Sequence, residues 1–173
     1  MAGEEICATV VVMKALLFFL LAGLLNAGEV KVGPLNFTVE EPWLMKPGRG
    51  MVKASARHGD SGPLLKFYYF GKGQGGSVAA NLERWKGQFQ GDKDVKEEVL
   101  EIGGRSVSLL TVRGTYLAGP PMGKKTPIQG QMMLGAVIPD AAGPVFLKMT
   151  GDEEAMLLAE ENFRRLLRSL EKS

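Results

Sequence analysis

The chain has 173 residues, a hydrophobic fraction of 45% and a net charge of +2, which fits one globular domain with an ordinary core. So small a positive charge, without a basic run that carries aromatic residues, argues against a nucleic-acid-binding protein. The one cysteine, Cys7, precedes an apolar segment, so a protein cleaved after that segment has no cysteine for disulfides, thiolate nucleophiles or metal ligation.

The N-terminal segment has the layout of a signal peptide. From Met13 the sequence reads MKALLFFLLAGLLNA: a basic start, a short apolar centre and a small residue, Ala27, at the predicted cleavage point. We therefore predict a leader at residues 1–27, a true start at Met13 and one exported domain at residues 28–173, periplasmic or extracellular. The apolar run is short for about 30 Å of hydrocarbon, so no membrane span is expected after processing. A retained anchor or a buried core helix is the alternative.

Three strands are predicted in the first part of the domain, because apolar and polar residues alternate or form a short apolar run. They lie at residues 35–40, 52–57 and 64–70. The third is apolar on both faces, which is typical of a central strand that is covered on each side. Pro42 and the Pro-Gly-Arg-Gly cluster at 47–50 interrupt the chain between the first two strands.

A helix is predicted over residues 77–90, with Ser77 as its N-cap. Four apolar residues recur at spacings of four, three and four: Val78, Leu82, Trp85 and Phe89. This stripe predicts that one face of the helix packs on the sheet. The sequence Gly-Asp-Lys-Asp at 91–94 is expected to end the helix.

Two hairpins are predicted next, with strands at 97–102, 105–116, 131–138 and 144–150. Gly103 and Gly104 join the first pair, because paired glycines tolerate the positive φ angles of a tight turn. The closing segment, 152–171, predicts an amphipathic helix that begins at a capping box of Thr150 and Glu153. Acidic residues open this helix and basic residues end it, as the helix dipole favours.

Two stretches carry a resemblance to a known family. Residues 37–43, FTVEEPW, are similar to an early strand that runs into a proline and a tryptophan, and residues 146–150, FLKMT, precede the long final helix. With the order of elements, these stretches resemble the PsbP-like fold, whose founding member is an extrinsic subunit of photosystem II. The resemblance implies an α+β fold: an antiparallel sheet of about six to seven strands with two packed helices, as an α/β/α sandwich.

The stretches 67–85, which begins FYYFG, and 133–136 also resemble secreted bacterial proteins of unassigned function. All these shared motifs concern architecture. The resemblance therefore carries no functional residue to this chain and gives no indication of photosynthesis.

A glycine-rich turn, GKGQGG at 71–76, follows a predicted strand and opens the first helix. Its glycines let an anion approach backbone N–H groups at the positive end of a helix. The candidate ligand-binding residues are Gly71, Lys72, Gly73, Gly76 and Ser77. A dinucleotide-binding fold is not expected, because hairpins follow in place of βαβ units. The alternative is a flexible turn that only brings the helix onto the sheet.

The sequence His58-Gly-Asp-Ser61-Gly resembles the nucleophile signature of trypsin-like proteases. Their mechanism needs a histidine and an aspartate from separate parts of the fold, whereas the one histidine here lies in the same turn as the serine. His58 also lacks further histidines or cysteines with which to ligate zinc. We therefore predict no catalytic residues, no metal site and no cofactor.

The segment 117–130 is predicted to be a loop of fourteen residues, which is long for a compact domain and typical of functional or disordered loops. Its candidate interaction residues are Pro120, Pro121, Met122, Lys124 and Lys125. We expect the loop to lie against the sheet near residues 71–76 and to form one wall of a groove. A solvent-exposed loop without a role is the alternative.

The function predicted from these features is that of an exported, non-catalytic binding or interaction module for a protein or a small ligand that the sequence does not identify. The alternative is a small extracytoplasmic hydrolase that uses carboxylate and hydroxyl side chains. The two differ in what a cleft should contain. An enzyme needs converging titratable groups, whereas a binding module needs an apolar or basic patch.

Overall fold

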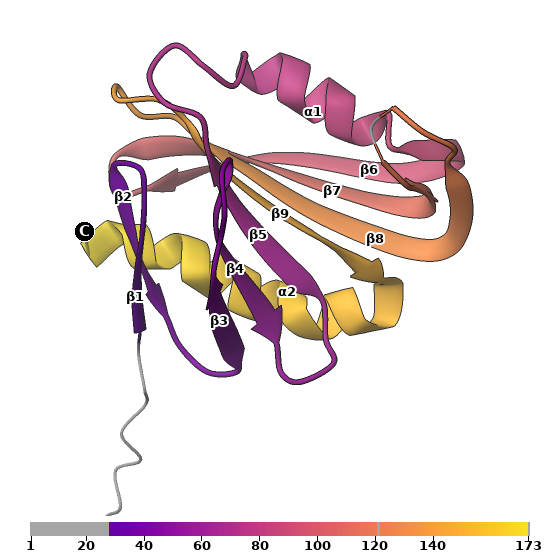
Figure 1. The fold of residues 1–173 in the computed structure, drawn as a ribbon, viewed down its shortest axis with the longest axis horizontal. Coiled ribbons are helices and arrows are strands. Elements are labelled where there is room, and N and C mark those ends of the chain that lie inside the picture. Colours follow the sequence, from indigo (N-terminus) through magenta and orange to yellow (C-terminus); the bar gives the residue numbers. More distant parts are fainter. Residues whose placement is uncertain (1–27, 121, 173) are drawn as a thin grey trace, which may run out of the picture.

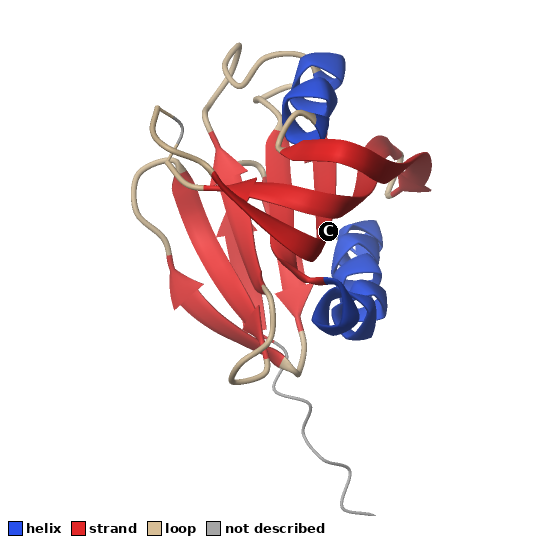
Figure 2. Ribbon diagram, turned by 90° about the vertical axis from the view of Figure 1, so that its right-hand side faces the viewer, coloured by secondary structure: helices blue, strands red, loops and turns tan. Residues whose placement is uncertain are grey.

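A seven-stranded antiparallel sheet forms the centre of the molecule, with a helix on each face (Figures 1 and 2). The structure is a computed structural model that describes residues 28–120 and 122–172, so the predicted signal peptide lies outside the described residues. In spatial order the strands are β3 (Trp43–Pro47), β4 (Val52–His58), β5 (Leu64–Tyr69), β9 (Val145–Asp152), β8 (Thr126–Ile138), β7 (Arg105–Ala118) and β6 (Phe89–Ile102). The predicted α+β architecture is confirmed.

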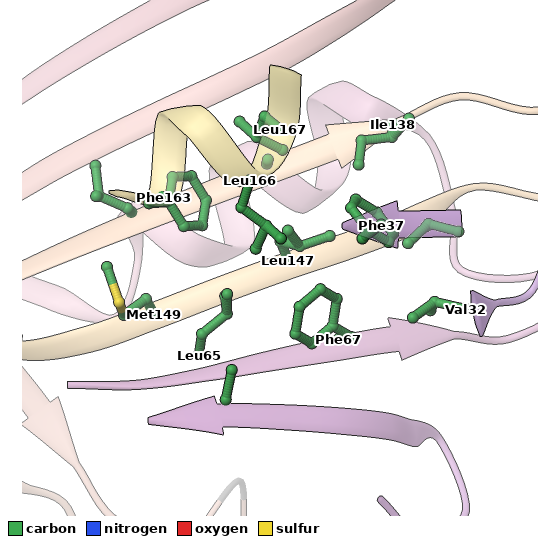
Figure 3. Packing of buried hydrophobic residues seen from close by; sticks show 14 of the residues in the cluster. Val32, Phe37, Leu65, Phe67, Ile138, Leu147, Met149, Phe163, Leu166 and Leu167 are labelled. Carbon is green, nitrogen blue, oxygen red and sulfur yellow. The ribbon is translucent and has the colours of Figure 1, made fainter. Parts of the chain in front are cut away.

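One face of this sheet is covered by α2 (Glu153–Arg168) and by a separate hairpin of β1 (Gly28–Val32) and β2 (Leu35–Val39). Because side chains alternate along a strand, Leu65 and Phe67 of β5 point to this face. They meet Phe163 of α2 and Phe37 of β2, and the rings of Phe37 and Phe67 lie 5.4 Å apart (Figure 3). A short 3-10 helix, η1 (Ser169–Lys172), follows α2.

The opposite face carries the shorter helix α1 (Val78–Lys86). Its Leu82 and Trp85 are buried against side chains of β7, β8 and β9. Gly135 of β8 makes this approach possible, because a Cβ at that position would lie 2.5 Å from the Trp85 ring. The predicted packing of this helix on the sheet, with Ser77 as its N-cap, is confirmed.

The predicted end of this helix at residue 90 is wrong. The helix ends at Lys86, where the N–H of Gly87 donates to the Glu83 carbonyl at 2.9 Å, and Phe89 already begins β6. Phe89 remains buried in the same cluster as Trp85. Phe89 therefore continues the spacing of the apolar face of α1 because it packs into the same core as Trp85, although it belongs to a strand.

The predicted capping box at Thr150 is also wrong. Thr150 belongs to β9, where it pairs with Leu64 and Met133. The N-cap of α2 is Asp152, whose Oδ1 accepts hydrogen bonds from the N–H groups of Glu154 at 3.1 Å and Ala155 at 3.4 Å. The strand therefore runs directly into the helix.

The structure contains more strands than the sequence predicts, and several of them are longer. β1 and β3 are not predicted, β6 begins eight residues earlier than expected, and β8 begins five residues earlier. As a result, half of the predicted loop at 117–130 is strand: Leu117 pairs with Pro127 and Ala118 with Thr126. Only residues 119–125 connect β7 to β8. The hairpin at Gly103 and Gly104 is confirmed, with φ angles of 55° and 73°.

Candidate functional site

A cleft of about 150 Å³ lies between α1 and the strands β5 and β9. Four aromatic residues form its apolar walls: Tyr68, Phe70, Trp85 and Phe146. Three residues with polar ends complete its lining: Arg84, Gln88 and Lys148. The cleft therefore combines aromatic surface with two cations and one amide.

The aromatic rings hold one another in place. The Phe70 ring meets the Phe146 ring edge to face at a centroid distance of 5.6 Å, and Trp85 meets Phe146 in the same manner at 6.4 Å. Tyr68 lies nearly parallel to Phe70 at 6.5 Å. Such pairs add to the stability that burial provides, so the walls of the cleft are part of the α1-side core.

Lys148 is the central cation of the cleft. Its Nζ donates a hydrogen bond to Gln88 Oε1 and lies 5.6 Å from the centroid of the Tyr116 ring. Burial, followed by repulsion from Arg84 and Lys66, lowers the pKa of the Lys148 ammonium to about 8. Within residues 28–120 and 122–172, no carboxylate lies within 4.0 Å of the Lys148 or Arg84 side-chain nitrogens.

Arg84 is held at the cleft by the buried side chain of Asn81. The guanidinium donates to Asn81 Oδ1, and Asn81 Nδ2 donates to the carbonyls of Gly75 at 2.7 Å and Ser77 at 2.8 Å. Asn81 thus ties the glycine-rich turn to α1 and orients the arginine. Gly75 is required here, because its φ is +90° and a Cβ would lie 2.8 Å from the Phe146 ring.

The predicted ligand-binding residues border the cleft and do not line it. Gly71, Lys72, Gly73 and Gly76 lie in the turn between β5 and α1, and the Ser77 hydroxyl accepts a hydrogen bond from the Ala80 N–H at 3.2 Å. These residues lie before the first turn of α1, whereas the helix residues that line the cleft, Arg84 and Trp85, lie in its last turn. A role for the turn residues in binding a ligand stays a prediction.

The predicted interaction loop lies elsewhere. Residues 119–125 precede the first residue of β8, whereas Gly71 packs against Gly143 just beyond its last residue. The thirteen residues of β8, about 40 Å of strand, separate the two sites. The expected groove between the loop and the glycine turn is therefore wrong.

Within this loop the predicted interaction residues differ in their surroundings. Met122 is fully exposed, and Lys125 Nζ donates to the carbonyls of Gly119, at 3.2 Å, and Pro120. Lys124 is exposed, and Pro121 lies outside the described residues. Binding by this loop stays a prediction.

A second groove, of about 240 Å³, lies on the α2 side and is larger than the cleft. Its charges are partly compensated: Arg165 lies 4.0 Å from Glu40, and Arg168 pairs with Glu161. We take the α1-side cleft as the candidate site, because its cations form no ion pair with a carboxylate of the described residues, and such cations are the stronger indication of an anionic ligand.

His58 contacts residues that belong to the packing of the fold, Trp43 and Asn162. The His58 ring packs edge to face on the Trp43 ring at 5.1 Å, and its Nε2 lies 3.1 Å from Asn162 Nδ2. Burial lowers the pKa of His58.

In the described part of the chain, no group of three or more His, Cys, Asp or Glu residues is placed to hold a metal ion. No helix of that part is long and apolar enough to cross a membrane.

Four residues of the cleft are not among the site residues predicted from the sequence: Arg84, Gln88, Phe146 and Lys148. One signal was present: Lys148 interrupts the apolar run of Val145 to Met149, and a lysine at such a position is expensive to bury without a reason. The remaining residues are brought together only by the pairing of β5 with β9 and by the position of α1.

Comparison with known proteins gives a likeness of structure. No protein-family model and no curated protein matches the sequence. The solution structure of cyanobacterial PsbP from Synechocystis sp. PCC 6803 is similar at 13% sequence identity and a TM-score of 0.56, covering 86% of this chain and 93% of that chain. A crystal structure of PA94, a protein of unknown function and putative regulator from Pseudomonas aeruginosa, matches at 13% identity and a TM-score of 0.43, covering 83% and 95%. At such identities a likeness concerns the fold alone, and the PsbP likeness shows that this chain has the PsbP-like fold.

Proposed function

We propose that the protein is a non-catalytic binding module for a partner protein. Its α1-side cleft binds an anchor segment of that partner, in which one apolar side chain enters the cleft and carboxylates stand on either side of it. The observation that carries this proposal is Lys148, a cation that lies among aromatic rings and more than 4.0 Å from every carboxylate of residues 28–120 and 122–172. An ammonium has three N–H donors, and Gln88 accepts from one of them. The remaining donors suit the oxygens of a carboxylate.

The size of the cleft supports a single side chain as the occupant. A volume of about 150 Å³ is comparable with a cavity that holds a benzene-sized group, and is below that of typical cofactor pockets. The rings of Phe70, Trp85 and Phe146 would contact such a group. Small pockets with aromatic walls hold the anchor residues that dominate many protein interfaces.

Charge supports an acidic partner. Arg84 and Lys148 both line the cleft, and Lys66 lies beside Lys148 in the neighbouring strand. Their mutual repulsion is relieved when an anion enters. Opposite charge also accelerates the encounter of two proteins, and salt screens that effect.

Export to the periplasm or the extracellular space remains part of the proposal, as does the loop of residues 119–125 as a separate contact surface. The hydrolase alternative stays a prediction from the sequence.

A labelled peptide tests the proposal directly. The probe is a capped pentapeptide of glycine, glutamate, phenylalanine, glutamate and glycine, and binding is followed by fluorescence anisotropy. We expect a dissociation constant below about 1 mM, and at least about tenfold weaker binding when alanine replaces phenylalanine or lysines replace the glutamates. Lys148→Met is expected to weaken binding about tenfold, because it removes a charge-assisted hydrogen bond.

Lys31→Gln is the matched control, because Lys31 is an exposed lysine of β1 on the other side of the sheet. It should bind the peptide as the unaltered protein does. Equal binding of the glutamate and lysine peptides, or no binding of either, contradicts the proposal. Cleavage of the peptide, seen by mass spectrometry, would favour the hydrolase instead.

A further inference from the structure

The larger groove, on the α2 side, is built from two walls. One wall is the end of β2 with the turn that follows it, including Glu40 and Glu41, and the other is the last part of α2, including Arg165 and Arg168. Trp43 and Leu166 supply apolar surface. The groove is therefore distinct from the α1-side cleft, and it lies on the opposite face of the sheet.

The walls are fixed to each other beside the groove. The Ser169 hydroxyl accepts a hydrogen bond from the Thr38 N–H at 3.0 Å and donates to the Leu166 carbonyl at 2.7 Å. On the helix wall, Asn162 is held by its contact with His58. The groove is thus a preformed feature of the fold, so a ligand that enters it pays little to order its walls.

Trp43 carries an unusual buried donor at this groove. The residue is only 7% exposed, and its indole Nε1 is buried without a hydrogen-bond partner among the described residues. A buried N–H that is not hydrogen-bonded costs about 1–3 kcal/mol. The Nε1 atom is covered by the protein, so a ligand in the groove meets the exposed part of the indole and not this donor.

The charges at the groove have opposite signs on its two walls. Arg165 Nη1 and Glu40 Oε2 are 4.0 Å apart, which is longer than a hydrogen bond. A ligand whose own charges are adjacent and opposite can meet both walls, whereas a simple anion meets attraction from Arg165 and repulsion from Glu40 and Glu41.

We propose that this groove binds a zwitterion, a free α-amino acid or a short peptide with charged termini, with its carboxylate toward Arg165 and its ammonium toward Glu40. The site is separate from the anchor cleft proposed above, and either proposal can fail without the other. The apolar surface of Trp43 and Leu166 suits an aliphatic side chain on the ligand.

Nuclear magnetic resonance of the full chain tests this site, because its two tryptophans give two indole N–H signals. Trp85→Phe assigns them. The probes are L-leucine and dialanine, with acetate, methylammonium and a doubly capped alanine as controls. We expect L-leucine or dialanine to shift the Trp43 signal saturably at millimolar concentration, to leave the Trp85 signal in place, and to act more strongly than any control.

Two variants sharpen the test. Arg165→Gln is expected to weaken binding about tenfold by calorimetry. Lys53→Gln, at an exposed lysine of β4, should not change it. Arg165 is exposed, so its replacement leaves the core intact and reports on binding. A Trp43 signal that no zwitterion moves overturns the proposal, and so does a signal that acetate moves as far as L-leucine.

Discussion

The two faces of the seven-stranded sheet are covered in different ways. On one face, the sixteen-residue helix α2 and the hairpin β1–β2 enclose a large apolar core in which Phe37, Phe67 and Phe163 are fully buried. On the other, the nine-residue helix α1 covers a smaller aromatic cluster and leaves a cleft with Lys148 in its lining. We infer that the first face mainly stabilises the fold, and that the second gives up stability for binding.

A single strand shows how the difference arises. In β9, Leu147 and Met149 point toward α2, whereas Phe146 and Lys148 point toward α1. Side chains of successive residues alternate between the faces, so one short strand supplies the core of one face and the cation of the other. Truncations on the two faces should therefore have different costs.

The largest loss of stability is expected when a side chain on the α2 face is truncated. Phe163→Ala should lower the free energy of unfolding by about 4 kcal/mol, because a fully buried ring is removed from a core that is closed on every side. Chemical denaturation measures the loss. Leu158→Ala, on the same helix but 74% exposed, is the control and should change stability by less than about 0.5 kcal/mol. Equal losses in the two variants would mean that α2 does not pack as described.

The corresponding change on the α1 face should cost less. Trp85→Ala is expected to lower the free energy of unfolding by about 3 kcal/mol, at the low end of the range for tryptophan, because its ring borders an open cleft. An unchanged denaturation midpoint contradicts the packing of α1 on the sheet. A loss greater than that of Phe163→Ala would reverse the ranking of the two faces.

A change of one methyl group probes the same contact from the sheet. Gly135→Ala places a Cβ 2.5 Å from the Trp85 ring and should cost about 2 kcal/mol, since the ring must move. Gly28→Ala is the matched control: its Cβ would meet only the Val39 carbonyl, at 3.9 Å. Thermal unfolding compares them, and a stable Gly135→Ala variant would show that α1 is loosely held.

The α2 face could be predicted from the sequence because its signals are local and repeated. The apolar stripe that includes Phe163 recurs over four turns, and the strand at 64–70 is apolar or aromatic except at Lys66. The end of α1 was missed because Phe89 keeps the helical spacing while it already belongs to a strand. β3 was missed because it is a five-residue strand that begins directly after one proline and ends at another.

The cleft was not predicted because no local pattern encodes it. Arg84 is an exposed residue of a helix, and Tyr68 lies eighty residues before Lys148 in the chain. They become neighbours through the pairing of β5 with β9 and the packing of α1. The sequence does show a lysine, Lys148, in an otherwise apolar strand. The free-energy cost of burying its charge is the quantity to measure.

The most direct test of the trade between stability and binding is the pH dependence of unfolding for Lys148→Met. The pKa of Lys148 is lowered from 10.5 to about 8, so folding disfavours its charged form. That cost is fully present below pH 8 and disappears as the pH rises from about 8 to 10.5, because the folded protein then releases its proton before the unfolded chain does.

We expect Lys148→Met to be about 1 kcal/mol more stable than the unaltered protein at pH 7, allowing for the partial exposure of the lysine, with a gap that narrows above pH 8. Tyr68 and Tyr116, whose pKa values are raised by burial, are present in both proteins, so their titration cancels in the difference. A variant that is less stable than the unaltered protein at pH 7, by an amount that does not change with pH, would contradict the account.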